Sequence, residues 1–456
     1  MTIDHHGLSR RRVLRLGAGG AMAAFLAACA AGGNGPSGTS SGNLEYWSGF
    51  ASKDAENWFR ANIVDAFNAT RPKAPVTLSV KQFDTMDRLV QTALAAGAGP
   101  DIVLASGPAQ VRAYADAGYL APLDDFAAKL GWNDRVLPWA LKTGVISGKL
   151  YALPSNYESL LCFYNPATLA QHGWTYPKTR AEFEALCAEA AGKSILPVAA
   201  GNADYQGANE WHVSIILNHA AGPEAMRQAL TGKAKFTDAV FVDAVTQLKG
   251  YFTKGWYGGG VDRYFTNTFS SQYQQLAAGK ALFNFTGTWG LGEITPFFGK
   301  EAGNSSEWAW GAIPSLRDGV PQEIWELSLG GTFSVNARSK HLDEAAALVD
   351  FLLSDPKRQA AGLSAAGLGL APIKISQADF PADMDKRTST LFAAIAAATD
   401  VGYTTWTFFP PKTDTYIIQS WEKVITGALS PQDYCKEIDS LFTSELTAGA
   451  VPPLPQ

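Results

Sequence analysis

The sequence has few of the residues that hold metal ions or form disulfide bonds, with 4 cysteines and 6 histidines among 456 residues. No Cys or His cluster has the spacing of a metal site, so we expect no metal and no other cofactor. Cys29 aside, three cysteines remain, and the sequence leaves open whether any two of them pair: Cys162, Cys187 and Cys435. Cys162 lies in the apolar run Leu160–Tyr164, which predicts a small buried side chain.

Motifs of the common catalytic sites are also missing. The body of the chain has no G-x-S-x-G elbow, no H-E-x-x-H, no phosphate-binding loop and no strand-placed G-x-G-x-x-G. The acidic pair Asp124-Asp125 follows Pro122 and is predicted to lie in a solvated turn. Glu158, beside Tyr157, is a better candidate for a buried acid, either as a ligand acceptor or as an interdomain contact. We therefore do not expect an enzyme.

Charged residues are scarce at 17%, hydrophobic residues reach 46%, and the formal net charge is −5. This composition indicates a globular body, and the length suits two compact units. The basic residues Arg10, Arg11, Arg12 and Arg15 fall in the first 28 residues, so the rest is more acidic still. Without a basic run, nucleic acid and anionic membrane are poor partners, and a neutral or cationic ligand is favoured.

Residues 1–28 are predicted to be a signal peptide. The basic cluster precedes an apolar run, Leu16–Ala28, that is shorter than the roughly 20 residues of a spanning helix. Ser9–Arg15 resembles a twin-arginine export signal. Leu26-Ala27-Ala28-Cys29 resembles a bacterial lipobox, which would make Cys29 the lipidated first residue of the mature protein. An ordinary Sec leader with an incidental cysteine is the alternative.

After a Gly- and Ser-rich tether over 29–43, strands and helices alternate. Strands are expected at 44–47, 76–80 and 102–105, with helices between them, and Asp84 or Thr85 could cap the second helix. This order indicates an α/β unit with a mostly parallel sheet. Ligands of such sheets lie beyond the carboxyl ends of the strands, here the loops 47–50, 82–85 and 106–109.

Aromatic residues are abundant, at 13 Trp, 15 Tyr and 24 Phe. Many are predicted to lie in loops beside polar residues, and Tyr403–Phe409 is expected to be an aromatic loop. Sugars stack their C–H faces on aromatic rings and bond their hydroxyls to planar polar groups. Loop positions single out Trp47, Trp289 and Trp406 as binding candidates, whereas Trp308 and Trp310 are predicted to be core residues.

The order of several short stretches resembles the extracellular solute-binding proteins of carbohydrate uptake, the family of maltose- and oligosaccharide-binding proteins. Leu282 stands where this family often has Met, and Phe163 where it often has Tyr. Ligand residues vary across the family, so the sugar stays open. The stretches that carry the resemblance are Ala95–Val103, Ala117–Asp125, Gly148–Pro154, Phe163–Pro166, Gly279–Leu282, Gly287–Trp289, Gly330-Gly331 and the helix after Ser339.

The resemblance implies a two-lobed periplasmic-binding-protein-like α/β fold, with a hinge near 153–157 and 325–330 and a ligand cleft between the lobes. Lobe 1 is expected to comprise 44–153 and 325–375, and lobe 2 to comprise 154–324 and 376–456. In the expected site, aromatic rings stack on the sugar, carboxylates and amides bind its hydroxyls, and a glycine admits the backbone. The expected site residues are Trp47, Asp84, Asn156, Tyr157, Glu158, Trp211, Trp289, Gly331 and Trp406.

The expected function follows from the same resemblance. The chain would be an exported, lipid-anchored monomer that captures a mono- or oligosaccharide and delivers it to the permease subunits of an ABC transporter. Two alternatives remain open at this point. One is a cell-surface carbohydrate-active enzyme, a lyase or hydrolase. The other is a binding protein for a polyamine, glycerol-phosphate or metal chelate, and an acid-lined cleft without aromatic platforms would favour the polyamine.

Overall fold

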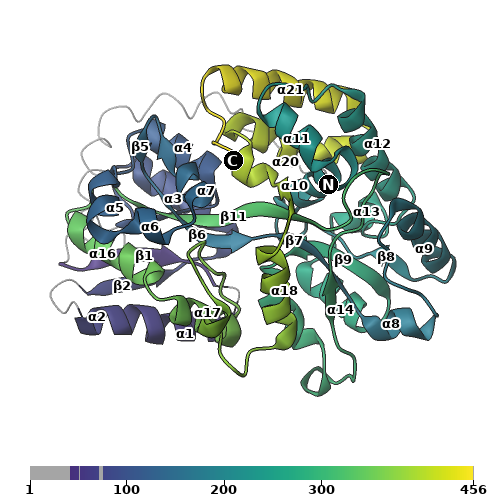
Figure 1. Ribbon diagram of the computed structural model, residues 1–456, viewed down its shortest axis with the longest axis horizontal. Helices are drawn as coiled ribbons and strands as arrows, with labels where there is room; N and C mark the ends of the chain where they lie inside the picture. Colours follow the sequence, from purple (N-terminus) through teal and green to yellow (C-terminus); the bar gives the residue numbers. More distant parts are fainter. Residues whose placement is uncertain (1–41, 51, 71–74, 455–456) are drawn as a thin grey trace, which may run out of the picture.

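The computed structural model describes residues 42–50, 52–70 and 75–454, apart from the side chains of Phe83 and Asp84. It consists of two α/β lobes (Figure 1). The predicted signal peptide, Cys29 and most of the tether lie outside the described residues. Among the described helices, none is long and apolar enough to cross a membrane.

The first sheet is built on three parallel strands from the start of the chain. β1 (Leu44–Ser48) pairs in parallel with β2 (Val76–Val80) and β3 (Ile102–Ala105), as the alternating sequence predicted. The long strand β11 (Ile324–Val335) runs antiparallel beside β3. Helices cover both faces and bury two apolar clusters. The helices of this lobe are α1 (Lys53–Phe59), α2 (Ala66–Thr70), α3 (Phe83–Ala95), α4 (Pro108–Asp116), α5 (Asp124–Leu130), α6 (Trp132–Arg135), α7 (Pro138–Thr143), α16 (Leu342–Leu353) and α17 (Pro356–Ala366).

A π-helical turn, Arg60–Asp65, joins α1 to α2, and a small hairpin, β4 (Val145–Ile146) with β5 (Lys149–Leu150), precedes the crossing to the second lobe.

The second sheet has the order β10-β7-β9-β8. Its strands are β7 (Leu160–Tyr164), β8 (Leu196–Val198), β9 (Ala281–Gly287) and β10 (Ala309–Gly311). Every residue of β9 is buried, including the polar residues Asn284 and Thr286. The helices around it are α8 (Pro166–Gln171), α9 (Arg180–Gly192), α10 (Ala208–Ile216), α11 (Pro223–Leu230), α12 (Ala239–Thr253), α13 (Val261–Tyr264), α14 (Phe269–Ala277), α15 (Gly290–Ile294), α18 (Lys386–Ala396), α19 (Thr405–Phe408), α20 (Pro411–Ile425) and α21 (Pro431–Thr447). A π-helical segment, Leu217–Ala221, continues α10, and short 3₁₀ turns occupy Thr295–Phe297, Lys300–Ala302 and Gln377–Asp379.

Strand β11 runs through the middle of the molecule and meets elements of both lobes (Figure 1). Its first residues pair with β12 (Asp400–Tyr403), and its last residues pair with β3. Between them, β6 (Leu153–Glu158) pairs antiparallel with β11 over Ser328–Phe333. These two strands form the crossing that the resemblance implied. The exact lobe boundaries predicted above remain a prediction.

Three local expectations were wrong. Helix α3 begins at Phe83 after Gln82, so neither Asp84 nor Thr85 is its cap. Asp124 and Asp125 are exposed as predicted but open α5 instead of forming a turn, and Asp124 accepts a hydrogen bond from the Leu150 backbone. Tyr403–Phe409 is not a loop: it ends β12 and forms α19, which buries its aromatic residues.

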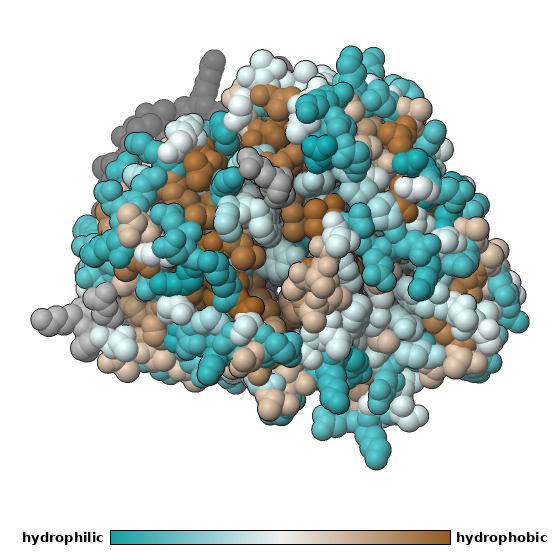
Figure 2. Space-filling model, viewed as in Figure 1, coloured by the Kyte–Doolittle hydropathy of each residue, from teal (hydrophilic) through white to brown (hydrophobic). Residues whose placement is uncertain are grey.

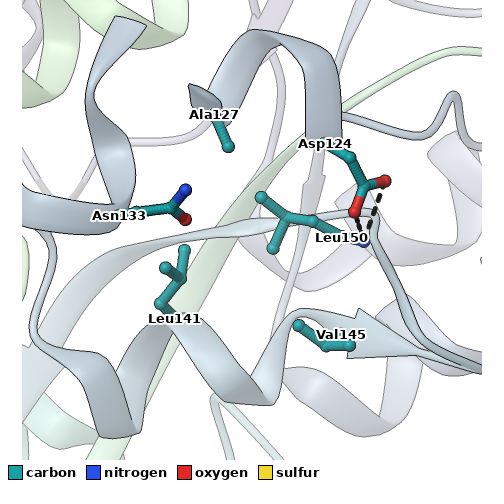
Figure 3. Close-up of a pocket in the computed structure, with 6 residues that line it drawn as sticks. All are labelled: Asp124, Ala127, Asn133, Leu141, Val145 and Leu150. Atoms are coloured by element: carbon teal, nitrogen blue, oxygen red, sulfur yellow. Dashed lines mark hydrogen bonds between the residues drawn. The ribbon is translucent and has the colours of Figure 1, made fainter. Parts of the chain in front are cut away.

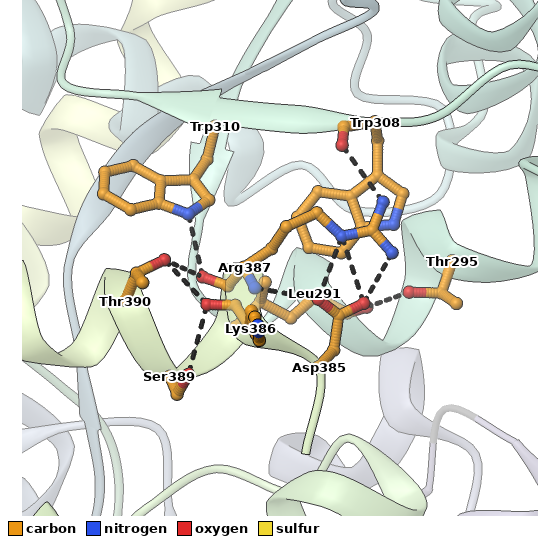
Figure 4. A network of polar contacts seen from close by, with 9 residues as sticks. All are labelled: Leu291, Thr295, Trp308, Trp310, Asp385, Lys386, Arg387, Ser389 and Thr390. Carbon is orange, nitrogen blue, oxygen red and sulfur yellow. Dashed lines mark hydrogen bonds and ion pairs between the residues drawn. The ribbon is translucent and has the colours of Figure 1, made fainter. Parts of the chain in front are cut away.

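The cysteines and two of the tryptophans behave as structural residues. Cys162, Cys187 and Cys435 are buried and unpaired. Figure 4 shows Trp308 beneath the guanidinium of Arg387, 4.1 Å from its ring centre. The indole of Trp310 donates to the Arg387 backbone carbonyl at 2.8 Å. Both rings therefore hold the start of α18 against the second sheet.

A buried polar pair fixes β11 to the second lobe. His219 Nε2 and Glu326 Oε1 lie 2.8 Å apart, and both side chains are fully buried. The other polar atom of each group, His219 Nδ1 and Glu326 Oε2, has no hydrogen-bond partner among the described residues. Within the described ranges, each side chain therefore has the other as its only direct partner.

Removing one member of this pair should be costly. His219→Ala leaves the Glu326 carboxyl buried without its partner, so we expect the free energy of unfolding to fall by about 3–5 kcal/mol. The control, Arg227→Ala, removes an exposed pair with Glu224 on α11 and should have little effect. Urea unfolding measures both variants. Equal stabilities would show that the buried pair does not hold the lobe to β11.

Candidate functional site

Three tryptophans from separate segments of the second lobe come together. The ring centres of Trp211 on α10 and Trp289 are 4.8 Å apart, and those of Trp289 and Trp406 on α19 are 6.0 Å apart. Phe269 stacks on Trp211 at 5.7 Å, and Tyr205 lies 5.9 Å from it. Trp211 and Trp289 are only partly buried. The sequence named all three tryptophans, and the structure brings them into one cluster.

Glycines let two of these rings fold back on the chain. A Cβ atom at Gly287, the last residue of β9, would lie 2.1 Å from the Trp289 ring. A Cβ at Gly207 would lie 2.3 Å from the Tyr205 ring. A side chain at either position would displace the ring beside it, so each glycine allows its ring to lie against the backbone.

The crossing strands supply the polar side of the site. Glu158 is opposite Ser328 on β11, Tyr157 opposite Leu329 and Asn156 opposite Gly331, with a bulge between Leu329 and Gly331. The bulge leaves Gly330 as the only residue of β11 that is not buried. A Cβ there would lie 1.7 Å from Glu158 Oε1, so the carboxyl group lies directly over Gly330. The sequence predicted that a ligand approaches the backbone at Gly331; this residue is buried, and a Cβ there would lie 2.6 Å from Ser155 Oγ.

A loop of the first lobe reaches the aromatic cluster. A Cβ at Gly107 would lie 2.8 Å from the backbone oxygen of Trp406 and 3.9 Å from that of Leu329 on β11. The preceding residue, Ser106, donates a hydrogen bond to Asp87 of α3 at 2.7 Å. The loop 106–109 was expected to border the ligand because it follows β3. The loop therefore contacts both β11 and the Trp406 backbone. We take the place where these three segments meet as the candidate cleft.

Apolar residues gather in the middle of the molecular face shown in Figure 2, between polar margins. Tyr157 adds to the aromatic surface, because its ring lies 5.7 Å from that of Trp139 on α7 of the first lobe. Asn156 lies against Gly369, where a Cβ would be 2.8 Å from its amide carbon.

Buried carboxyl groups dominate the electrostatics of the cleft. Burial raises the pKa of Glu158 to about 8, and its neighbour Asn156 opposes the shift. Burial and the adjacent Asp414 raise the pKa of Glu210 well above its usual value, while Thr405 donates to Glu210 at 3.3 Å. Burial also raises the pKa of Asp414 to about 6. Burial therefore holds a proton on both carboxyl groups to higher pH than in an exposed side chain.

Trp47 and Asp84, which were also expected at the site, belong to β1 and α3 of the first lobe. Trp47 lies on β1, packs against the α3 side of the sheet and carries the Lys81 ammonium 4.5 Å from its ring centre. No contact in the described part of the chain joins it to the three tryptophans. Asp84 lies in the first turn of α3, but its side chain is outside the described residues.

The sequence analysis did not select several residues that the structure places at this site: Trp139, Glu210, Phe269, Asp414 and Asp87. Only Glu210 could have been selected from the sequence, because it directly precedes the candidate Trp211. Asp414 and Trp139 are far from the other site residues in the chain, so only tertiary structure could reveal them.

A second hollow lies within the first lobe, away from the tryptophans. Figure 3 shows this pocket of about 260 Å³ between α5, α6 and α7. Asp124, its only acid, already accepts hydrogen bonds from Leu150 N, and Ala127, Leu141 and Val145 make the rest largely apolar. It offers no free polar group to orient a ligand except Asn133. In the described residues, no group of three His, Cys, Asp or Glu side chains could hold a metal ion.

The raised pKa of Glu158 predicts a pH dependence of stability. In the unfolded chain Glu158 ionises near 4.5, whereas in the folded chain it keeps its proton up to about 8. The stability it contributes is therefore complete below pH 4.5 and falls as the pH rises towards 8, by at most about 1.4 kcal/mol per pH unit. Glu158→Gln should reduce the loss of melting temperature between pH 5 and pH 8.

The control for this prediction is Glu224→Gln. An Arg227 hydrogen bond lowers the pKa of Glu224 to about 2, so it stays ionised across this range and its replacement should leave the pH dependence as in the unaltered protein. If Glu158→Gln had the same pH profile as the unaltered protein, Glu158 would not be the protonated group.

Comparisons with known proteins agree with this architecture. The family model for bacterial extracellular solute-binding proteins matches residues 51–359. A "Probable sugar-binding periplasmic protein" of Mesorhizobium japonicum is 31% identical over 188 residues, 40% of this chain and 42% of that protein. The diacetylchitobiose-binding protein DasA of Streptomyces coelicolor is 32% identical over 131 residues, 28% of this chain and 29% of that protein. The chain thus spans less than half the length of these relatives.

Among solved structures, a chitin oligosaccharide binding protein superposes with a TM-score of 0.74 at 21% identity, covering 88% of this chain and 98% of the other. This likeness confirms the two-lobed fold. Because the family model covers more than half of the sequence, this chain belongs to the bacterial extracellular solute-binding proteins.

Proposed function

We propose that this protein captures a saccharide in the cleft between its lobes and delivers it to the permease of an ABC transporter. The observation that carries the proposal is the cluster of Trp211, Trp289 and Trp406 facing the polar crossing strands. Partly exposed aromatic faces beside carboxyl and amide groups are what a sugar ring with its hydroxyls requires. The relatives above bear the names of sugar- and chitobiose-binding proteins, which supports the same ligand class.

In the proposed site, Trp289 is the central platform because it touches both of the other tryptophans. Asn156 and Glu158 bond to hydroxyls from the crossing, with Tyr157 beside them, and the ligand approaches the backbone at Gly330, next to the buried Gly331. Trp47 and Asp84 would border the first lobe's side of the cleft.

Closing of the lobes supplies the signal to the transporter. The ligand would touch the second lobe through the tryptophans and the first lobe through the loop 106–109, so it binds best when both are near. A ligand shifts an open–closed equilibrium only by its preference for one state. No covalent step is required, and the protein would act as a monomer.

The leader gives the proposed location. Residues 1–28 direct export by a twin-arginine-like or a Sec signal, and lipidated Cys29 with the tether 29–43 holds the lobes at the outer face of the membrane. This proposal rests on sequence alone.

The saccharide site is tested by Trp289→Ala. A saccharide at about 100 times its dissociation constant should add about 2.7 kcal/mol of stability, seen as a raised melting temperature in a thermal-shift screen. Trp289→Ala should abolish that shift, because it removes the platform shared by the other two rings.

The matched control is Trp174→Ala. Trp174 is also partly exposed but stacks on His172 at 4.3 Å in another part of the second lobe, so this variant should keep the shift. A full shift in Trp289→Ala would contradict the site, and a screen in which no saccharide raises the melting temperature would contradict the function.

The lipid anchor is tested by Cys29→Ser. The unaltered protein should fractionate with membranes and incorporate labelled fatty acid, whereas Cys29→Ser should do neither. Cys162→Ser, at a buried cysteine, is the control and should remain acylated. Membrane association of Cys29→Ser with undiminished labelling would rule out this anchor.

A further inference from the structure

We propose that the segment after α21, Gly449–Pro453, ties the second lobe to helix α4 of the first lobe and so limits how far the candidate cleft opens. We call this segment the strap. The inference goes beyond the proposed function, because it concerns the movement of the lobes in the protein without ligand and does not depend on which solute binds.

The strap begins at a helix end that is fixed to the second lobe. Gly449 has a φ of +67°, and its N–H bonds to the Leu446 carbonyl at 2.9 Å, while the next N–H bonds to the Glu445 carbonyl at 2.8 Å. This is the Schellman turn that glycine favours after a helix. The Glu445 side chain also accepts from two backbone N–H groups at the start of α20. The beginning of the strap therefore moves with α20, which directly follows the tryptophan helix α19.

Beyond this turn the chain packs against the second lobe. The side chains of Val451 in the strap and of the following Leu454 lie against the large apolar core of that lobe. Pro452 and Pro453 stand between them, and proline stiffens a segment because its ring fixes the φ angle. If the lobes separate, the strap therefore stays with the second lobe.

A side chain of the first lobe bonds to the strap. Arg112 on α4 donates from Nη1 to the carbonyl oxygen of Gly449 at 2.7 Å. The carbonyls at a helix end have no partner within the helix, so this oxygen is available to a donor from outside. The Nε of Arg112 pairs with Asp116 of the same helix at 3.2 Å, an exposed pair that does not involve the strap. The hydrogen bond to Gly449 thus joins the two lobes.

The strap does not pack tightly against the first lobe. A hollow of about 90 Å³ lies between it and α4, the end of α7 and the β4–β5 hairpin. Separating two closely packed apolar surfaces would expose both to water, whereas a hydrogen bond beside a hollow can exchange for bonds to water at small net cost. The contact is therefore suited to a junction that opens and closes.

The strap lies on the same side of the crossing strands as the candidate cleft. Helix α4 begins directly after Gly107, which lies against the Trp406 backbone and close to β11. Arg112 follows about one turn later, and α4 lies beside α20 of the second lobe (Figure 1). A rotation about β6 and β11 that widens the cleft carries α4 away from α20. It therefore breaks the hydrogen bond between Arg112 and Gly449.

This bond favours the closed arrangement of the lobes. An interaction that exists in only one of two states shifts the equilibrium towards that state. A solute that needs both lobes then meets a larger fraction of protein ready to bind it, so its apparent affinity rises. The strap would act in this way on any solute held between the lobes.

The experiment measures the distance between the lobes in the protein without ligand. Spin labels are attached at Lys129→Cys on α5 and Lys233→Cys after α11, two exposed positions, in a Cys29→Ser background. The native cysteines of the described ranges are buried and stay unlabelled. Pulsed electron resonance then gives the distribution of distances between the two labels.

Two variants weaken the strap from opposite sides. Arg112→Ala removes the bond to the first lobe and should raise the ratio of long to short distances about fivefold, the effect of losing one hydrogen bond. Val451→Ser loosens the packing on the second lobe and should shift the ratio in the same direction. The matched control is Asp116→Ala, which removes the exposed ion pair within α4 but leaves the bond to Gly449, so its distribution should match that of the unaltered protein.

The outcomes separate this inference from the proposed function. An unchanged distribution in Arg112→Ala would overturn the strap, and so would an equal shift in Asp116→Ala, because the effect would then belong to α4 itself. A shift in Arg112→Ala without one in Val451→Ser would contradict the attachment of the strap to the second lobe. None of these results depends on a saccharide, so the receptor function stands or falls with the thermal-shift screen alone.

Discussion

The structure depends on the pairing of β6 with β11 where the chain crosses between the lobes. β11 joins both lobes because it pairs with β12 at one end and with β3 at the other. The bulge between Leu329 and Gly331 interrupts this otherwise buried strand, exposes Gly330 and allows Glu158 to lie over it. The same irregularity therefore lies where the chain crosses between the lobes and places a carboxyl group at the candidate site. The His219–Glu326 pair ties the start of β11 to the second lobe beside it.

Much of the fold was readable from the sequence because the relevant patterns are local. The short runs at 44–47, 76–80 and 102–105 identified three sheet strands correctly. The local structure of two segments, Asp124-Asp125 and Tyr403–Phe409, was predicted wrongly. Both contact residues that are distant in the sequence. Helix starts such as that of α3 were also misplaced, since nothing local separates Phe83 from Asp84.

The candidate site was also predictable only in part from the sequence. Trp211, Trp289 and Trp406 were identifiable one by one, because tryptophans in predicted loops and polar contexts are unusual. Their contact was not predictable, and neither were Asp414 and Trp139, which come from helices remote in sequence. The combination itself, three tryptophans beside buried carboxyl groups, became visible only in the tertiary structure.

The most direct test of the central claim is a crystal structure of the protein with a saccharide that raises its melting temperature. The account predicts a sugar ring against Trp289 between the lobes, with polar groups of the ligand bonded to Glu158 and Glu210. A saccharide bound elsewhere, such as in the first-lobe pocket beside Asp124, or an empty cleft with all three tryptophans free of ligand, would contradict it.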